Sequence, residues 1–304
     1  MELKWLEDFL SLAETGSFSR SAQLRHVTQP AFSRRIRALE AWIGTPLVDR
    51  TSYPTKLTGA GEAFREHAGE LLRDIHEARA AARGSRPIPA DTLAFAVPHA
   101  LSLGYFPRWI SRVEREFGEF GSKLSALNVH DAVMQLVEGH CDLLLCYHHP
   151  QQPVRLDAER YAMLCLGHEV VRPYAKAGTS GAPLWRLPGT ASHPVPYLAY
   201  SPNAFLGRVV EAILASARTP HHLRRRYETD MAEALKVMAI EGHGVAWLPD
   251  SALGSPKARS LVPAGDERWG APVEIRLYRD RARSRPLLDA LWTVLAGKLH
   301  AESA

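Results

Sequence analysis

The stretch that decides the fold is residues 16–50, which read GSFSRSAQLRHVTQPAFSRRIRALEAWIGTPLVDR. Its second half carries apolar residues at spacings of four, three and four, the period of one helical face; these are Phe32, Ile36, Leu39 and Ile43. Thr28 can cap this helix and Gly44 ends it. A shorter helix is expected over about residues 19–24, with a tight turn at 25–28. The pattern therefore predicts a helix-turn-helix.

The second of these helices keeps a polar and basic face away from its apolar stripe. Such a helix fits the major groove of double-stranded DNA, where glutamine pairs with adenine edges and arginine with guanine edges. Residues 45–58 are rich in turn formers, and brief strands at 47–48 and 56–57 predict a wing beside the helix. The candidate DNA-binding residues are Thr28, Gln29, Ser33, Arg34, Arg37, Arg50 and Lys56.

Charge along the chain supports a polyanionic partner. Residues 1–16 carry a net charge of −3, whereas residues 17–58 carry +5. A basic block of this kind is the electrostatic footprint of a nucleic-acid-binding domain. Hydrophobic residues make up 46% of the chain and charged residues 23%, which excludes a disordered or fibrous protein. A helical bundle with one solvated basic face is the competing explanation.

The same residues resemble the winged helix-turn-helix of LysR-type transcriptional regulators. The resemblance rests on Gly16-Ser17-Phe18, Ala22-Gln23-Leu24, the run from Gln29 to Glu40, and the run from Gly44 to Arg50, followed by Leu57-Thr58-Gly59-Ala60-Gly61. It implies a sequence-specific DNA-binding domain over residues 1–58 of a regulator that is not an enzyme. Three cysteines are too few for a disulfide scaffold, so a reducing, cytoplasmic location is expected. The ordered match of so many positions favours this interpretation over the helical bundle.

A long helix is expected after the wing, because residues 60–84 contain no proline and are dominated by Ala, Glu, Arg and Leu. Six apolar positions repeat every 3.5 residues on average, as in a seam that pairs two helices; they are Phe64, Ala68, Leu71, Ile75, Ala78 and Ala82. Alternatively, these six positions form the apolar face of a helix that packs within its own domain. We expect residues 59–86 to be a linker helix that forms a homodimer. The family resemblance adds a pairing of effector domains and hence a homotetramer.

The Pro-rich segment 87–89 marks a domain boundary, and strand-like and helical runs alternate beyond it. This alternation predicts an α/β domain with parallel strands. The strands are expected near 93–97, 124–129, 142–147, 195–200, 244–248 and 273–278. The resemblance implies that residues 90–304 form an effector domain of two subdomains, like a periplasmic binding protein. One subdomain comprises about 90–165 plus 269–304, and the other about 166–268.

Open sheets of this kind bind ligands at the carboxyl ends of their strands. A cleft between the two subdomains should combine polar groups with apolar walls, which suits a small organic anion or a reactive oxidant. The candidate effector-binding residues are His99, Ala100, Ser102, Val129, His130, Ser201, Asn203, Met231 and His243.

Three stretches, at residues 37–43, 99–104 and 200–203, resemble the hypochlorite-responsive branch of the family. That branch implies methionine oxidation, which turns an apolar side chain polar. Met231 is the candidate sensor because it precedes the helix that leads to the turn at 242–244. Leu206, however, stands where that branch has an oxidisable residue. A ligand bound in the cleft, oxidation of Cys146, and a core-filling role for Met231 therefore remain alternatives.

Motifs of enzymes and metal sites are absent from the sequence: there is no Gly-x-Ser-x-Gly, P-loop or Gly-x-Gly-x-x-Gly. No cofactor or metal is expected. A solute-binding or enzymatic α/β protein with a helical N-terminal extension is the alternative to a regulator. The expected partners are double-stranded DNA, a small-molecule or oxidant effector, further copies of this chain and RNA polymerase. No membrane partner is expected, because the apolar runs are far shorter than a membrane span.

Overall fold

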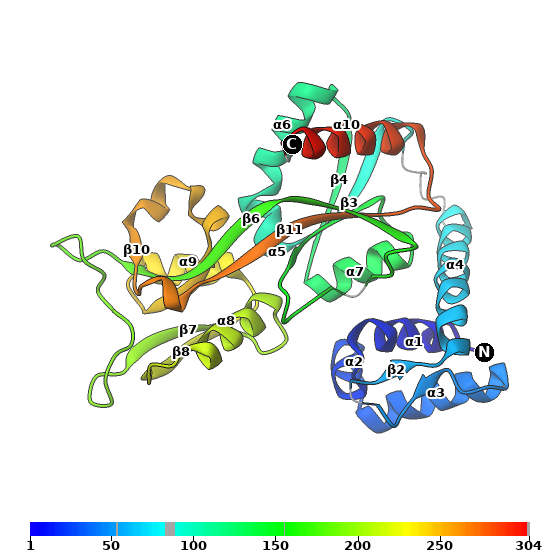
Figure 1. The fold of residues 1–304 in the computed structure, drawn as a ribbon, viewed down its shortest axis with the longest axis horizontal. Coiled ribbons are helices and arrows are strands. Elements are labelled where there is room, and N and C mark those ends of the chain that lie inside the picture. Colours follow the sequence, from blue (N-terminus) through cyan, green and yellow to red (C-terminus); the bar gives the residue numbers. More distant parts are fainter. Residues whose placement is uncertain (53, 83–88, 155, 303–304) are drawn as a thin grey trace.

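The computed structural model describes residues 1–52, 54–82, 89–154 and 156–302 (Figure 1). A helical N-terminal domain is joined by one long helix to a larger α/β domain. The elements of the N-terminal part are α1 (Leu3–Thr15), α2 (Phe18–Leu24), α3 (Gln29–Ile43), β1 (Val48–Asp49), β2 (Lys56–Leu57) and the long helix α4 (Gly59–Ala82). The sequence therefore places all three helices, the two-stranded wing and the long helix correctly. Residues 83–86 of the expected linker lie outside the described part of the chain.

The larger domain alternates strands and helices, which confirms the α/β class. Its strands are β3 (Thr92–Pro98), β4 (Gly121–Leu127), β5 (Leu143–His148), β6 (Tyr161–Lys176), β7 (Val195–Tyr200), β8 (Leu223–Thr229), β9 (Val245–Pro249), β10 (Leu261–Pro263) and β11 (Ala271–Asp280). Its helices are α5 (His99–Gly104), α6 (Phe106–Phe117), α7 (Val129–Val137), α8 (Phe205–Ser216), α9 (Ala232–Ile240) and α10 (Pro286–Glu302). Short 3-10 helices cover Asp250–Gly254, Pro256–Ser260 and Glu267–Trp269.

Two parallel groups of strands, joined by a pair of antiparallel strands, make this sheet. Within the described residues the order is β4-β3-β5-β11-β6-β9-β7-β8, and β10 pairs with β6. The groups β4-β3-β5 and β9-β7-β8 are parallel, whereas β11 and β6 run antiparallel to each other over most of their length. Because β6 and β11 belong to both halves, they fix the two subdomains relative to each other (Figure 1). No described helix is long and apolar enough to cross a membrane.

The first half of α4 belongs to the core of the DNA-binding domain, which corrects the expected seam. Phe64 lies 5.4 Å from Phe9 of α1 between ring centroids, and Ala68 is fully buried in the same core. Leu72, outside the predicted seam, is fully buried there as well. The physical reason is that α1 packs along the start of α4, so these positions already have a partner within the chain.

The second half of α4 keeps the seam exposed. Leu71 is 43% exposed, Ile75 is 41% exposed, and Ala78 is exposed too. The side chain of Ala82 lies outside the described part. Among the seam positions whose side chains the structure describes, Leu71, Ile75 and Ala78 are thus free to face a second copy of the chain.

The DNA-binding domain also packs against helix α7 of the effector domain (Figure 1). Met134 of α7 is buried in the core formed by α1, α3 and α4. His130 of α7 forms an ion pair with Glu14 of α1, and its Nε2 lies 3.5 Å from the Ser11 hydroxyl. At the end of α7, burial together with the nearby carboxylate of Glu7 raises the pKa of Glu138 to about 7.

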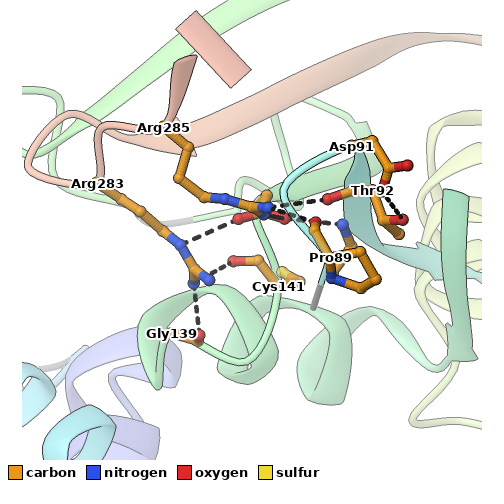
Figure 2. A network of polar contacts seen from close by, with 9 residues as sticks. Pro89, Asp91, Thr92, Gly139, Cys141, Arg283 and Arg285 are labelled. Carbon is orange, nitrogen blue, oxygen red and sulfur yellow. Dashed lines mark hydrogen bonds and ion pairs between the residues drawn. The ribbon is translucent and has the colours of Figure 1, made fainter. Parts of the chain in front are cut away.

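A buried carboxylate ties the exit of the linker to the effector domain. Asp142, which is fully buried just before β5, accepts a hydrogen bond from the Ala94 amide at 2.8 Å. It pairs with Arg283 Nε at 3.0 Å and with Arg285 Nη1 at 2.8 Å. Figure 2 shows Arg285 reaching from the segment after β11 toward the start of β3, where it donates to the Pro89 and Thr92 carbonyls. Arg283 also donates to the Gly139 and Cys141 carbonyls.

Replacing Asp142 should destabilise the effector domain. Asp142→Ala leaves two partly buried guanidinium groups without their carboxylate, and breaking such a pair costs about 3–5 kcal/mol. Denaturant unfolding measures the change. Glu116→Ala is the matched control, because its ion pair with Lys298 is exposed and should matter little. Equal stability of the two variants would contradict the role given to Asp142.

Candidate functional site

The helix-turn-helix is shaped by caps at each helix boundary. Gly16 ends α1 in the left-handed region at φ 60°. The Ser17 hydroxyl caps α2 by accepting from the Arg20 amide, and the Thr28 hydroxyl caps α3 by accepting from the Ala31 amide. These caps turn the chain sharply between the helices and place α3 on the side of the domain away from the effector domain (Figure 1).

The predicted recognition face is exposed along α3. Thr28, Gln29, Arg34 and Arg37 are exposed, and Ser33 is half-buried. Within the described residues no carboxylate pairs with Arg34 or Arg37. Their guanidinium groups are therefore available to bases or phosphates.

A buried carboxylate in α1 fixes α2 and α3 to each other. Asp8 is fully buried and pairs with Arg25 at 2.9 Å and with Arg35 at 3.2 Å. Arg25 pairs with Glu7 too. Arg35 thus differs from Arg34 and Arg37, because its guanidinium group is paired with Asp8 within the domain.

Arg50 holds the wing to α3, and its contact with DNA stays a prediction. Its guanidinium pairs with Glu40 at 2.6 Å. The same Glu40 carboxylate accepts hydrogen bonds from the Leu47 and Val48 amides at 3.0 and 3.2 Å. Binding of Arg50 to DNA would compete with this ion pair. Lys56, on the other wing strand, is exposed and remains a candidate phosphate contact.

A cleft opens between the subdomains at the carboxyl ends of β3, β4, β5 and β8. It has a volume of about 50 Å³ and is lined by residues from both halves. They are Pro98, His99, Ala100, Leu127, Asn128, Val129, Tyr147, Ala204, Phe205, Leu206 and Asp230. His99, Ala100 and Val129 are therefore placed as the sequence predicts.

The remaining predicted residues on the strand ends beside this cleft do not line it. The hydroxyl of buried Ser102 donates to the His99 carbonyl at 2.9 Å. Ser201 is occupied through its backbone, bonding to Thr229 and Ala204. Asn203 lines a neighbouring cavity instead. Met231 is 39% exposed at the start of α9, next to the cleft residue Asp230.

Two histidines lie elsewhere, contrary to the prediction. His243 precedes β9, and the adjacent Gly244 lies against the Pro196 carbonyl at the start of β7. Because β7 and β9 are parallel, His243 sits at the amino ends of these strands, opposite the cleft. His130 follows Val129 by one helical residue, so its side chain turns toward α1 and pairs with Glu14.

Sequence reasoning missed eight of the eleven residues that line the cleft. Among these, Tyr147 and Phe205 stack with ring centroids 6.3 Å apart, and Leu206 and Asp230 line the same cleft. Tyr147 is the penultimate residue of β5, and Asp230 follows β8 directly. The rule that ligands bind at carboxyl ends of strands would have selected Tyr147. Asp230 could be predicted as a cleft residue only if the strand β8 before it was predicted. The polar sequence Arg224-Arg225-Arg226 does not show the apolar pattern of a strand.

The buried thiol of Cys146 is unsuited to oxidation. Cys146 is fully buried, and burial raises the pKa of its thiol to about 12. Oxidants react with the thiolate, which is scarce at such a pKa. Cys141 is in the same state, with a pKa of about 12 for the same reason. In the described part of the chain, no group of three His, Cys, Asp or Glu side chains could hold a metal ion.

An exposed, capped recognition helix beside a wing, joined to a two-subdomain sheet with a cleft, defines an effector-responsive DNA-binding regulator. Comparison with known proteins leads to the same class. Residues 3–62 match the family described as bacterial regulatory helix-turn-helix protein, lysR family, and residues 88–299 match the LysR substrate binding domain. The chain belongs to the LysR family of transcriptional regulators.

Relatives span nearly the whole chain. The HTH-type transcriptional regulator YjiE of Escherichia coli is 32% identical over 97% of this chain and 94% of its own. Vibrio fischeri DarR, solved in complex with DNA, is 31% identical with a TM-score of 0.59, covering 97% and 98% of the two chains. Full-length HypT of Salmonella typhimurium, described as a hypochlorite-specific LysR-type regulator, is 29% identical with a TM-score of 0.59, covering 99% of each.

These findings identify the function of the chain at the level of the family. It binds DNA through the helix-turn-helix and responds to effectors through the substrate-binding domain. It is a regulator rather than an enzyme, as its relatives are. A solute-binding or enzymatic protein with a helical extension is thereby set aside.

Arg34 and Arg50 should differ when each is replaced by alanine. Arg34→Ala removes an exposed side chain, so we expect an unchanged fold and a loss of specific DNA affinity on the order of 1–3 kcal/mol. Arg50→Ala should instead lower the unfolding temperature, because Glu40 loses its partner. Gel-shift titration and thermal unfolding separate the two. Undiminished specific binding by Arg34→Ala would refute the proposed docking of α3.

Proposed function

We propose that this regulator acts as an oligomer whose paired recognition helices read DNA under the control of a small effector bound in the cleft between the subdomains. The observation that carries the effector site is the cleft itself, which joins residues of both halves at the carboxyl ends of strands. A ligand there would change how the halves close. Thr28, Gln29, Ser33, Arg34, Arg37 and Lys56 are the proposed DNA contacts.

The chemistry of the cleft suggests the kind of effector. Tyr147 and Phe205 supply a stacked aromatic wall, and Leu206 adds apolar surface. His99 and Asp230 supply the polar groups. A carboxylate in the cleft disfavours a purely anionic ligand. We therefore propose a small molecule with an apolar face and at least one hydrogen-bond donor.

Oxidant sensing is the second candidate, and two observations favour it. HypT, described as hypochlorite-specific, is similar over the full length of the chain. Met231 is 39% exposed beside the cleft residue Asp230, where oxidation would add a polar oxygen.

A DNA-binding regulator works where the chromosome lies, so we propose a cytoplasmic location and contact with RNA polymerase at the promoter.

The assembly is proposed to use the exposed second half of α4. Leu71, Ile75 and Ala78 form an exposed apolar strip along α4. Two copies paired along this strip would place their recognition helices on half-sites spaced by whole turns of DNA. A second pairing through the effector domains gives the proposed homotetramer.

Leu71→Glu should reduce the particle mass, because it places an unpaired charge in the helix pair. Multi-angle light scattering measures the mass of the parent and the variant. Glu66→Lys is the control, since it changes an exposed charge on the opposite side of α4. An unchanged mass for Leu71→Glu would place the interface elsewhere.

Two variants distinguish ligand binding from methionine oxidation. The readout is gel-shift affinity and reporter activity with DNA from upstream of the chain's own gene, before and after hypochlorite. Ala100→Trp fills the cleft and should fix the reporter output while DNA affinity is retained. Ala182→Trp, in an exposed loop, is its control.

Met231→Leu keeps the size of the side chain but cannot be oxidised. Loss of the hypochlorite response in Met231→Leu supports oxidant sensing at this residue. An unchanged hypochlorite response in Met231→Leu, together with a fixed reporter output in Ala100→Trp, supports a bound effector. Normal responses in both variants would refute both candidates.

A further inference from the structure

A second cavity lies between the DNA-binding domain and the effector domain, beside the cleft. It has a volume of about 130 Å³ and is bounded by α1 and α2 on one side and by α7, α8 and the segment after β5 on the other. Because about 10–15 Å³ suffices for one water molecule, the cavity has room for a small polar molecule. It shares Asn128, Val129 and Phe205 with the cleft, so the two hollows are neighbours.

Two arginines from different domains line this cavity. Arg208 of α8 donates to the Gln152 side chain at 2.9 Å and to the Asn203 carbonyl at 2.6 Å. Within the described residues no carboxylate comes within ion-pair distance of Arg208, although its side chain is half-buried. Arg20 of α2 reaches the cavity from the DNA-binding domain.

The positive charge of Arg208 is unfavourable at this cavity, because the side chain is partly buried and lies near a second arginine. Burial, together with the like charge of Arg20, lowers the pKa of Arg208 to about 10. Glu14 and Glu211 act in the opposite direction but lie beyond ion-pair distance, so Arg208 holds its charge in a poorly solvated place. A bound anion would give Arg208 a close counter-charge and would lie beside Arg20, which lines the same cavity.

The other polar groups of the cavity are suited to the same kind of ligand. The side-chain amides of Gln151 and Asn203 can donate hydrogen bonds. Glu14 is the one carboxylate on the wall among the described residues, and His130 already pairs with it. The first turns of α7 and α8 both border the cavity, and helix N-termini favour negative charge.

We propose that this cavity is a binding site for a small oxyanion, a phosphate or a short carboxylate, held between Arg20 and Arg208. Such an anion would bridge α2 and α8 and stabilise the docked arrangement of the two domains. It would be a second ligand site, distinct from the effector cleft. The influence of this anion on DNA binding rests on the proposed function, whereas binding of the anion to the cavity does not.

The test measures anion binding to the full-length protein without DNA. Inorganic phosphate and malonate are titrated by calorimetry, and thermal unfolding is followed in each, with sodium chloride at equal ionic strength as the reference. We expect phosphate, malonate or both to bind and to raise the unfolding temperature above the chloride value. A response to one anion alone identifies which source of the oxyanion the site prefers.

Arg20→Gln and Arg208→Gln should each weaken binding at least about tenfold, since each removes a charged hydrogen-bond donor. Arg224→Gln is the matched control, because Arg224 is exposed on the edge strand β8, and it should bind like the parent. Arg20 and Arg208 belong to different domains, so the test survives if one variant does not fold. Circular dichroism checks folding.

The proposal is overturned if neither anion binds, or if a folded Arg20→Gln or Arg208→Gln variant binds as tightly as the parent. Failure of effector gating would leave these binding results unchanged, so the two proposals are separable. DNA affinity with and without the anion, at constant ionic strength, then shows whether the docked arrangement favours or opposes DNA binding.

Discussion

The buried carboxylate of Asp142 is the constraint on which the arrangement of this chain depends. Its charge is compensated by Arg283 and Arg285, which belong to the segment between β11 and α10. Arg285 also donates to the carbonyls of Pro89 and Thr92, where the chain enters the effector domain. An unpaired charge at this depth would be prohibitively costly. The first strand after the linker, the strand β5 and the end of β11 are therefore locked together.

Helix α7 connects the effector domain to the DNA-binding domain. Its first residue, Val129, lines both the effector cleft and the anion cavity. Further along, Met134 is buried in the core of the DNA-binding domain, and Glu138 lies near Glu7 of α1. One rigid element thus contacts the proposed ligand sites and the DNA-binding domain. A shift of α7 on ligand binding would be felt by α1 without a flexible intermediary.

Much of the DNA-binding half could be predicted because its signals are local. Three signals act within a few residues: the cap at Thr28, the glycine at position 44, and the four-three-four spacing of Phe32, Ile36, Leu39 and Ile43. The effector half was harder. Strand β6 is the longest in the described sheet, yet Gly167 breaks its apolar pattern. Pro173, which has no backbone N–H group to donate, also lies within this strand. Strand β8 is an exposed edge and reads as polar.

The sequence by itself determined the helix-turn-helix, the exposed face of α3, the long helix and the alternation that makes an α/β domain, because helix periodicity, caps and breakers are written in neighbouring residues. Only the tertiary structure decided how charges and faces are shared between distant segments. It paired Arg50 with Glu40, turned His130 toward Glu14, and moved His243 to the far end of the sheet. It also packed Phe64 against α1 and buried Ala68 in the same core, while leaving Leu71 exposed. A partner that is remote in the chain leaves no periodic signal in the sequence, so these roles depend on the folded arrangement.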